Sequence, residues 1–489
     1  MKPATATPKS AGAVFLIGAQ AVFLVSSYAL HMVIARVLGP AGYGVFGVVF
    51  NMVSILYVLV SGGVPQAVAR YVGGRIGRPE EVKRRALALQ VGVSAAIVLA
   101  YLLASVPIAT LLADLELAPY IQVSALAIPA YALYSLWSGY LGGLHLFFRQ
   151  ALVVGLYALL KMLAVCVLAY AAGITGALVG VAVAPIGALL VALRLTPAVA
   201  DEGRGEVGHR ALLGFAGPFT IFAMATEAMT MVDLLLVKAI VGDDLSVGHY
   251  TAAATIGRVP YLLLIGLGTA VLPAMARTMA AAEPGSADYV ARQVIRLVLL
   301  LIVPAVALMA STAGPIVDLL YSSQYAPAAA AVPLLTAGMS LSALFRVCAS
   351  MESGAGGEKT SMAVALFALA VGLGAGYFLT GAYGVAGAAF ANLLMGAVAS
   401  AITLALIVRR HRCSLPLLTL VRSAVAALPI VAMPSLLPTS PAILPVVLLI
   451  DGVAYLLLLG ALGELGSEEL RIVRSLLPAG GLPFIHRSA

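Results

Sequence analysis

Residues 211–241 read ALLGFAGPFTIFAMATEAMTMVDLLLVKAIV, an apolar stretch long enough to cross a bilayer that nevertheless carries three charges. On a helical wheel, Glu227, Asp233 and Lys238 fall within one arc, together with two threonines. A charge at the bilayer centre costs about 2.5–3.5 kcal/mol, so such side chains usually face protein or water. The stretch therefore predicts a membrane helix with one polar face toward a cavity. The alternatives are that Lys238 reaches the outer surface and that Asp233 only pairs with it.

The composition of the whole chain places it among membrane proteins. Of 489 residues, 62% are hydrophobic and 10% are charged, whereas soluble proteins carry about 25% charged residues. The net charge of +8 does not indicate nucleic-acid binding, because lysine and arginine lie in short connections between apolar stretches. Three cysteines and six scattered histidines have no spacing typical of a disulfide framework or a metal site. We therefore expect no metal and no bound cofactor.

The apolar stretches predict an all-α membrane protein with fourteen spanning helices. The predicted spans are 12–38, 43–73, 85–112, 119–145, 150–173, 174–196, 211–241, 246–275, 292–320, 328–350, 360–381, 383–408, 416–436 and 441–463. Lysine and arginine gather in every second connection, and the connections between them carry none. Cytoplasmic loops carry this excess of positive charge, so we predict a cytoplasmic membrane location with both termini in the cytoplasm.

A weak internal repeat divides the chain. IARVLGPAGYGVF at 34–46 corresponds to LVKAIVGDDLSVGHY at 236–250, and ITGALVG at 174–180 corresponds to YGVAGAAFA at 383–391. Repeated membrane halves with a substrate site between them are typical of secondary transporters. We predict two six-helix lobes, 1–205 and 206–410, around a central cavity. Two further helices and a cytoplasmic tail would occupy 411–489.

Few charges lie inside the predicted spans, and cations prevail at mid-depth. The candidate substrate-binding residues are Arg36, Lys161, Arg258 and Arg346, although Arg36 and Arg346 lie near enough to a surface to extend toward it. The candidate ion-coupling or charge-pairing residues are Glu227, Asp233 and Lys238. Guanidinium and ammonium groups suit phosphate, so the cavity is expected to take an anionic ligand. Between the last two spans, Asp451 is expected to pair with Arg422.

Several stretches resemble the polysaccharide and oligosaccharide-lipid flippases of the MATE-like superfamily. They are ARVLGPAGYGVFGVVFNMVSILYVLVSGGVPQAVARYV (35–72), VDLLLVKAIVGDDLSVGHYTAAATIGRVPYLL (232–263), SSQYAPAAAAVPLL (322–335) and YGVAGAAFANLL (383–394). The resemblance implies outward movement of a polyprenyl-linked phosphate or diphosphate sugar by alternating access, with a cationic cavity for the diphosphate. It also implies that Arg36 occupies a signature position.

Four functions compete at this stage, and one of them is a non-transporting scaffold, against which the mid-membrane charges Lys161 and Glu227 argue. The leading hypothesis is a flippase for a lipid-linked oligosaccharide, working beside glycosyltransferases or a polymerase within membrane lipids, and coupled to Na⁺, H⁺ or the membrane potential. The runner-up is a cation-coupled exporter of drugs or small molecules from the same superfamily. That branch typically places an acid in the first helix, whereas the predicted spans of 12–196 contain neither Asp nor Glu. A membrane-embedded glycosyltransferase normally needs a large outer loop with carboxylates, so we predict that the protein is not an enzyme.

Overall fold

The structure, a computed structural model, describes residues 9–198, 207–281, 286–354, 357–411, 414–436 and 443–464. These residues form α-helices and one 3₁₀ helix, and no strand occurs among them. The helices are α1 (Lys9–Gly62), α2 (Val64–Gly73), α3 (Pro79–Leu111), α4 (Leu117–Ser124), α5 (Ala127–Gly143), α6 (Phe147–Leu195), α7 (His209–Ala228), α8 (Val232–Val241), α9 (Asp244–Ala281), α10 (Ser286–Leu320), η1 (Ser323–Ala330), α11 (Val332–Gly354), α12 (Glu358–His411), α13 (Leu417–Ala426), α14 (Leu428–Leu436) and α15 (Leu444–Ala461). The predicted all-α class is confirmed.

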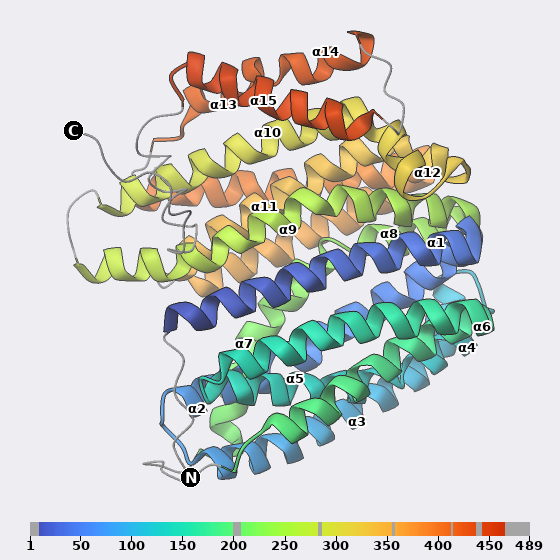
Figure 1. Cartoon of the computed structure of the whole chain (residues 1–489), viewed down its shortest axis with the longest axis vertical. Coiled ribbons are helices and arrows are strands. Elements are labelled where there is room, and N and C mark those ends of the chain that lie inside the picture. The colour runs from blue at the N-terminus through green and yellow to red at the C-terminus, as the bar shows by residue number, and fades with distance from the viewer. Residues whose placement is uncertain are drawn as a thin grey trace.

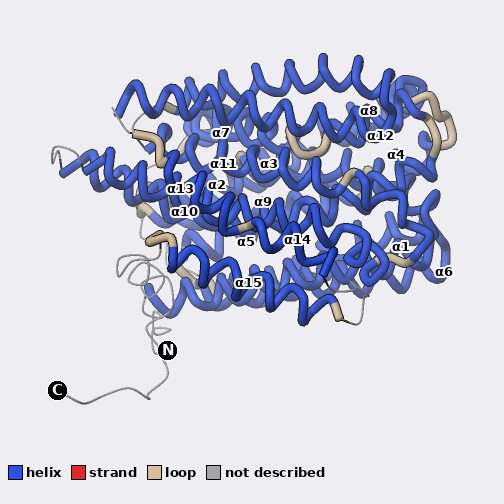
Figure 2. Tube along the Cα trace, turned by 90° about the horizontal axis from the view of Figure 1, so that it is seen from above, coloured by secondary structure: helices blue, strands red, loops and turns tan. Residues whose placement is uncertain are grey.

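Most of these helices run along one common direction, as the view from above shows (Figure 2). Among the described residues, eight helices are long and apolar enough to cross a membrane, or nine if the bent pair of α7 and α8 is one span. Helices α1, α6 and α12, with 54, 49 and 54 residues, are far longer than the roughly 20 residues that a single crossing needs. Each contains a non-helical glycine, at Gly39, Gly173 and Gly384, where the chain reverses. Each therefore supplies two crossings, consistent with the predicted set of spans.

The internal repeat is visible in the backbone. Gly173 adopts φ 60° and ψ −139°, and Gly384 adopts φ 58° and ψ −135°, a conformation that glycine alone takes readily. Three residues further on, a Cβ atom on Gly176 would lie 1.8 Å from the Leu168 carbonyl oxygen, and one on Gly387 would lie 1.9 Å from that of Leu379. The same tight hairpin thus occurs once in each half of the chain.

The helices before residue 198 and those after residue 207 gather on opposite sides in Figure 1, with α1 and α9 where the two sets meet. We call these sets the N-half (9–198) and the C-half (207–411). Helix α7 belongs to the C-half by sequence, yet it packs against α1, α2 and α3 of the N-half as well as against α12. The lobe boundaries predicted at residues 205 and 410 stay a prediction.

The last helices, α13 to α15, pack on α10 at the edge of the C-half, away from the N-half (Figure 1). The expected pair of Arg422 with Asp451 is wrong. Arg422 Nη1 lies 3.2 Å from Glu464, which also pairs with Arg296 at 2.9 Å. Glu464 lies three residues beyond the end of α15 at Ala461 and contacts both arginines, whereas Asp451 lies within that helix. Asp451 is buried, and its carboxylate has no hydrogen-bond partner among the described residues.

Candidate functional site

A polar cavity of about 410 Å³ lies between the two halves. The N-half contributes residues of α1, α5 and α6 to its wall, and the C-half contributes residues of α7, α8, α9 and α11. Volumes of about 300–1,000 Å³ are typical of ligand sites. Five of the seven predicted site residues line it: Lys161, Glu227, Asp233, Arg258 and Arg346. The structure thus brings together side chains from five helices at one place.

The stretch 211–241, predicted as one continuous helix, is broken beside this cavity. Helix α7 ends at Ala228 and α8 begins at Val232, with a bend of 47° between them. The break exposes three carbonyl groups, and three polar side chains bind them. Asn392 lies 3.5 Å from the carbonyl oxygen of residue 229, Arg258 2.8 Å from that of residue 230, and Asn51 3.1 Å from that of residue 231. Non-helical backbone at membrane depth is tolerated only where such partners or a cavity satisfy it.

Two of the cavity cations have no ion-pair partner among the described residues. Lys161 is 6% exposed, and its Nζ donates a hydrogen bond to the Ser27 hydroxyl at 3.3 Å. Arg258 donates Nη2 to the Thr230 carbonyl, while its buried Nε has no partner within the described protein. Arg346 donates to the Tyr261 hydroxyl at 2.8 Å and lies 3.9 Å from Glu227. The positive charge of the cavity is therefore only partly balanced by its own acids.

The two acids of the cavity have different surroundings. Glu227 is partly exposed and faces Arg346, so this charge near mid-depth has a cation opposite it. Asp233 is buried and accepts hydrogen bonds from the Tyr250 hydroxyl at 2.6 Å and from Asn392 at 3.0 Å. No lysine or arginine forms an ion pair with Asp233 among the described residues, so the suggested pair with Lys238 is wrong. Both residues lie on α8, five positions apart and so on different sides of the helix, and Asp233 lines the cavity whereas Lys238 does not.

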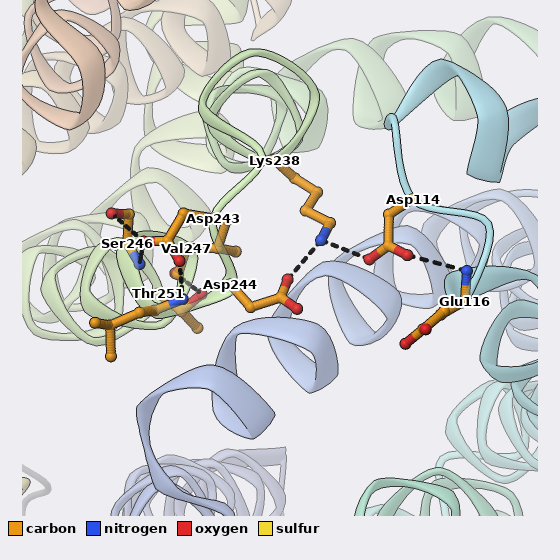
Figure 3. Close-up of polar contacts among 9 residues, drawn as sticks. Asp114, Glu116, Lys238, Asp243, Asp244, Ser246, Val247 and Thr251 are labelled. Atoms are coloured by element: carbon orange, nitrogen blue, oxygen red, sulfur yellow. Dashed lines mark hydrogen bonds and ion pairs between the residues drawn. The ribbon is translucent and has the colours of Figure 1, made fainter.

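Lys238 lies outside the cavity, in an ion cluster that joins the two halves (Figure 3). Its Nζ lies 2.6 Å from Asp114, in the connection between α3 and α4, and 2.5 Å from Asp244, the first residue of α9. Lys238 is 1% exposed, so it does not extend to the surface as the alternative reading suggested. We call the end of the molecule that holds this cluster the acidic end, and the opposite end the basic end.

Asp243 fixes the start of α9 beside this cluster. Its carboxylate accepts hydrogen bonds from the Ser246 hydroxyl at 2.8 Å and from the Ser246 backbone N–H at 2.9 Å (Figure 3). This is the usual arrangement by which an acid satisfies the first free N–H groups of a helix. The same hydrogen bonds hold the pKa of Asp243 below its ordinary value. The turn that carries Asp244 toward Lys238 is therefore anchored locally.

Close backbone contact also seals the acidic end. A Cβ atom on Gly44 would lie 2.4 Å from the Asp244 carbonyl oxygen, and one on Gly248 would lie 1.9 Å from that of Pro40. Gly44 and Gly248 are the corresponding glycines of the sequence repeat, so the repeat signature forms the contact between halves. Arg36 also lies here, donating to the Leu319 carbonyl at 3.0 Å. The structure places Arg36 outside the cavity, because the chain reverses only three residues later, at Gly39.

The aromatic part of the cavity wall has no counterpart among the predicted site residues. Tyr57, Tyr131 and Tyr157 line the cavity, with Tyr57 and Tyr131 stacked at 3.8 Å between ring centroids. The sequence does contain an indication of this wall, because tyrosines lie in the middle of apolar spans, where a buried hydroxyl group needs a hydrogen-bond partner. No group of three or more His, Cys, Asp or Glu able to hold a metal ion occurs in the described part of the chain.

These features define a class, that of multi-pass α-helical membrane proteins in which two repeated halves enclose a polar cavity. Residues 33–330 match the family described as "Polysaccharide biosynthesis protein", and the chain belongs to that family. No curated protein matches the sequence.

Solved structures with a similar fold are membrane transporters. A lipid II flippase MurJ in an inward closed conformation has a TM-score of 0.75 at 15% identity, over 95% of this chain and all of that one. An inward-facing MATE family multidrug resistance transporter of the MOP superfamily has a TM-score of 0.70 at 16% identity, over 80% of this chain and 94% of that one. An outward-facing MATE family transporter has a TM-score of 0.60 at 17% identity, over 82% and 94%. At sequence identities of 15–17%, this similarity shows that the chain shares the fold of these proteins.

Proposed function

We propose that the protein moves a lipid-linked oligosaccharide, carried on a polyprenyl phosphate or diphosphate, across the cytoplasmic membrane by alternating access. The family to which the chain belongs and the flippase fold both support this function. The substrate is amphiphilic, so it meets the protein from the lipid phase with membrane lipids as neighbours. Glycosyltransferases or a polymerase act on the same lipid-linked sugar before and after transport. The protein itself carries out no chemical step.

The observation that carries the proposal is the pair of cavity cations, Lys161 and Arg258, that have no ion-pair partner in the part of the chain that the structure describes. A charged side chain near the bilayer centre costs about 2.5–3.5 kcal/mol on insertion scales unless a group of opposite charge offsets it. Lys161 lies on the N-half wall and Arg258 on the C-half wall, so an anion between them contacts both halves. A diphosphate offers several oxygens to a guanidinium group, which can bind them in pairs. Such a ligand would offset the charge and couple the halves.

The charge of the basic end supports an orientation in the membrane. The basic end carries the arginine-rich connections around Arg75, Arg78 and Arg149, and positive loops remain in the cytoplasm. The acidic end therefore faces outward, and both chain ends face the cytoplasm. Closure by the Lys238 cluster and the Gly44–Gly248 contact then corresponds to an inward state. The higher TM-score with the inward-facing MATE structure than with the outward-facing one agrees with this state.

An ion gradient supplies the energy in this proposal, and Asp233 is the better of the two candidate coupling acids. Its carboxylate is buried in the cavity wall without an ion-pair partner among the described residues, whereas Glu227 has Arg346 at 3.9 Å. A Na⁺ ion or a proton would neutralise the Asp233 carboxylate at low cost because the site is already desolvated. In this proposal Glu227 partly offsets the positive charge of Arg346 and does not bind the coupling ion.

The second candidate function is a cation-coupled exporter of small molecules. Glu227 and Asp233 in the same cavity favour it, as does the likeness to MATE transporters. Three cations against two acids in the cavity wall argue against an organic cation as substrate.

The test is transport by the purified protein in liposomes, with a polyprenyl-diphosphate sugar and a panel of organic cations as separate substrates. We expect movement of the lipid-linked sugar and its loss in Arg258→Ala and in Lys161→Ala at unchanged expression. Arg149→Ala is the matched control, because this arginine lies outside the cavity and donates to the Leu195 carbonyl within the same half. Transport of organic cations alone, or full transport in both cavity variants, would overturn the proposal.

A further inference from the structure

The two halves contribute unlike surfaces to the cavity. The C-half wall contains the acids and both arginines, with Tyr261 as its aromatic residue among the lining residues described. The N-half wall contains Lys161 and six aromatic side chains: Phe23, Tyr28, Phe50, Tyr57, Tyr131 and Tyr157. Tyr131 stacks on Tyr57 with an interplanar angle of 11° and contacts Tyr157 at 5.7 Å. The C-half side of the cavity therefore holds most of the charges, and the N-half side is an aromatic wall with one lysine.

Hydrogen-bonding atoms without protein partners accompany these rings. Tyr57 is 8% exposed and Asn51 is 7% exposed, and both line the cavity. The Tyr57 hydroxyl and the Asn51 Oδ1 atom have no hydrogen-bond partner among the described residues, and neither has the Tyr28 hydroxyl. The Asn51 amide is held in place because its Nδ2 donates to the Met231 carbonyl at 3.1 Å. An unmade hydrogen bond at a buried group costs about 1–3 kcal/mol, so a ligand that supplies partners gains that free energy.

The position of Lys161 excludes a cationic ligand from the aromatic wall. Its Nζ lies 4.7 Å from the ring centroid of Phe23 and 5.8 Å from those of Phe50 and Tyr157. The negative faces of these rings thus already hold a cation. A second cation there would be repelled at close range, because the site is buried and poorly screened.

The ligand chemistry that fits has an apolar face for the rings, hydroxyl groups for the free polar atoms, and no positive charge. A sugar ring has these properties: one face is largely C–H, and its rim carries groups that both donate and accept. We propose that Tyr57, Tyr131 and Tyr157 form a sugar subsite, with Tyr57 and Asn51 hydrogen-bonding to sugar hydroxyls. This inference rests on the proposed function and adds the place of the sugar: it lies against the rings of the N-half, while the phosphate lies between Lys161 and Arg258.

The experiment measures binding of two lipids by the purified full chain: a polyprenyl diphosphate without sugar and the same lipid bearing one hexose. The wild-type protein is expected to bind the hexose-bearing lipid more tightly. Tyr57→Phe removes one hydroxyl and keeps the stack, so it should weaken binding of the hexose-bearing lipid by about threefold to tenfold, the usual worth of one hydrogen bond. Tyr131→Leu should do likewise by removing one ring. Neither variant should change binding of the sugar-free lipid.

Tyr134→Phe is the matched control, because Tyr134 belongs to the same ring cluster, 4.6 Å from Tyr157, without lining the cavity. It should change neither affinity, and thermal unfolding should confirm that all three variants fold. The subsite is overturned if both lipids bind equally, or if Tyr57→Phe and Tyr131→Leu leave the preference for hexose intact. If neither lipid binds to the protein, the proposed function itself is overturned. Arg258→Ala should weaken both lipids alike and so separates the phosphate site from the sugar subsite.

Discussion

Asp114→Asn tests whether the ion cluster at the acidic end holds that end closed. Lys238 bridges the halves only through Asp114, because its other partner, Asp244, lies on the same half as Lys238. Opening the acidic end must therefore break the 2.6 Å contact with Asp114 and can leave the contact with Asp244 intact. Asparagine keeps the shape of the side chain and removes its charge.

The magnitude follows from the burial of the three groups. Breaking a fully buried ion pair costs about 3–5 kcal/mol. Here Lys238 is 1% exposed but Asp114 is 20% exposed, and Asp244 still neutralises the lysine, so the loss should be smaller, about 1–2 kcal/mol. A change of that size shifts an equilibrium about 5–30-fold. Asp114→Asn should thus raise the ratio of open to closed molecules at the acidic end by that factor.

Spin labels at Leu115 and Leu245 provide the assay, because both side chains are exposed and flank the cluster on opposite halves. Distance distributions measured by pulsed electron resonance should gain a longer component in Asp114→Asn. Asp244→Asn removes an equal charge from the same lysine within one half, so it should shift the ratio by less than about threefold. Equal shifts in the two variants, or no longer component in either, would refute the reasoning.

Three further predictions concern the glycines and the coupling acid. Gly248→Ala puts a Cβ atom 1.9 Å from the Pro40 carbonyl and should also lengthen the distance between the labels at the acidic end, whereas Gly452→Ala, in open space, should not. Gly384→Ala places a side chain at φ 58° and should lower the free energy of unfolding by about 1–3 kcal/mol, seen as a lower Tm than that of Gly381→Ala. Asp233→Asn keeps an acceptor for the Tyr250 hydroxyl and removes the negative charge. Transport in liposomes should therefore lose its dependence on an imposed Na⁺ or proton gradient. Unchanged dependence would show that Asp233 does not bind the coupling ion.

Much of the cavity could be predicted from charge and depth alone. Lys161, Arg258 and Glu227 line it, because a charge in the middle of an apolar span has few places to lie except a polar interior. Asp233 lines it as well, and so does Arg346, which was expected near enough to a surface to extend toward it. Depth in the span can be read from each residue without knowledge of its neighbours. A charge near a helix end, such as Arg36, can lie either in a cavity or in a contact between connections, and depth does not distinguish the two.

The sequence by itself determined the membrane class, the repeat and the hairpin positions, because hydrophobic length and glycine placement are local properties of the chain. Only the tertiary structure decided the partners of Lys238 and Arg36, since Asp114 and Leu319 come from remote segments. It also decided the bend at residues 229–231, which exists because Asn51, Arg258 and Asn392 approach from three other helices to bind the freed carbonyls. The aromatic wall is likewise a product of packing, in which rings from α1, α5 and α6 meet across distances that no sequence spacing encodes.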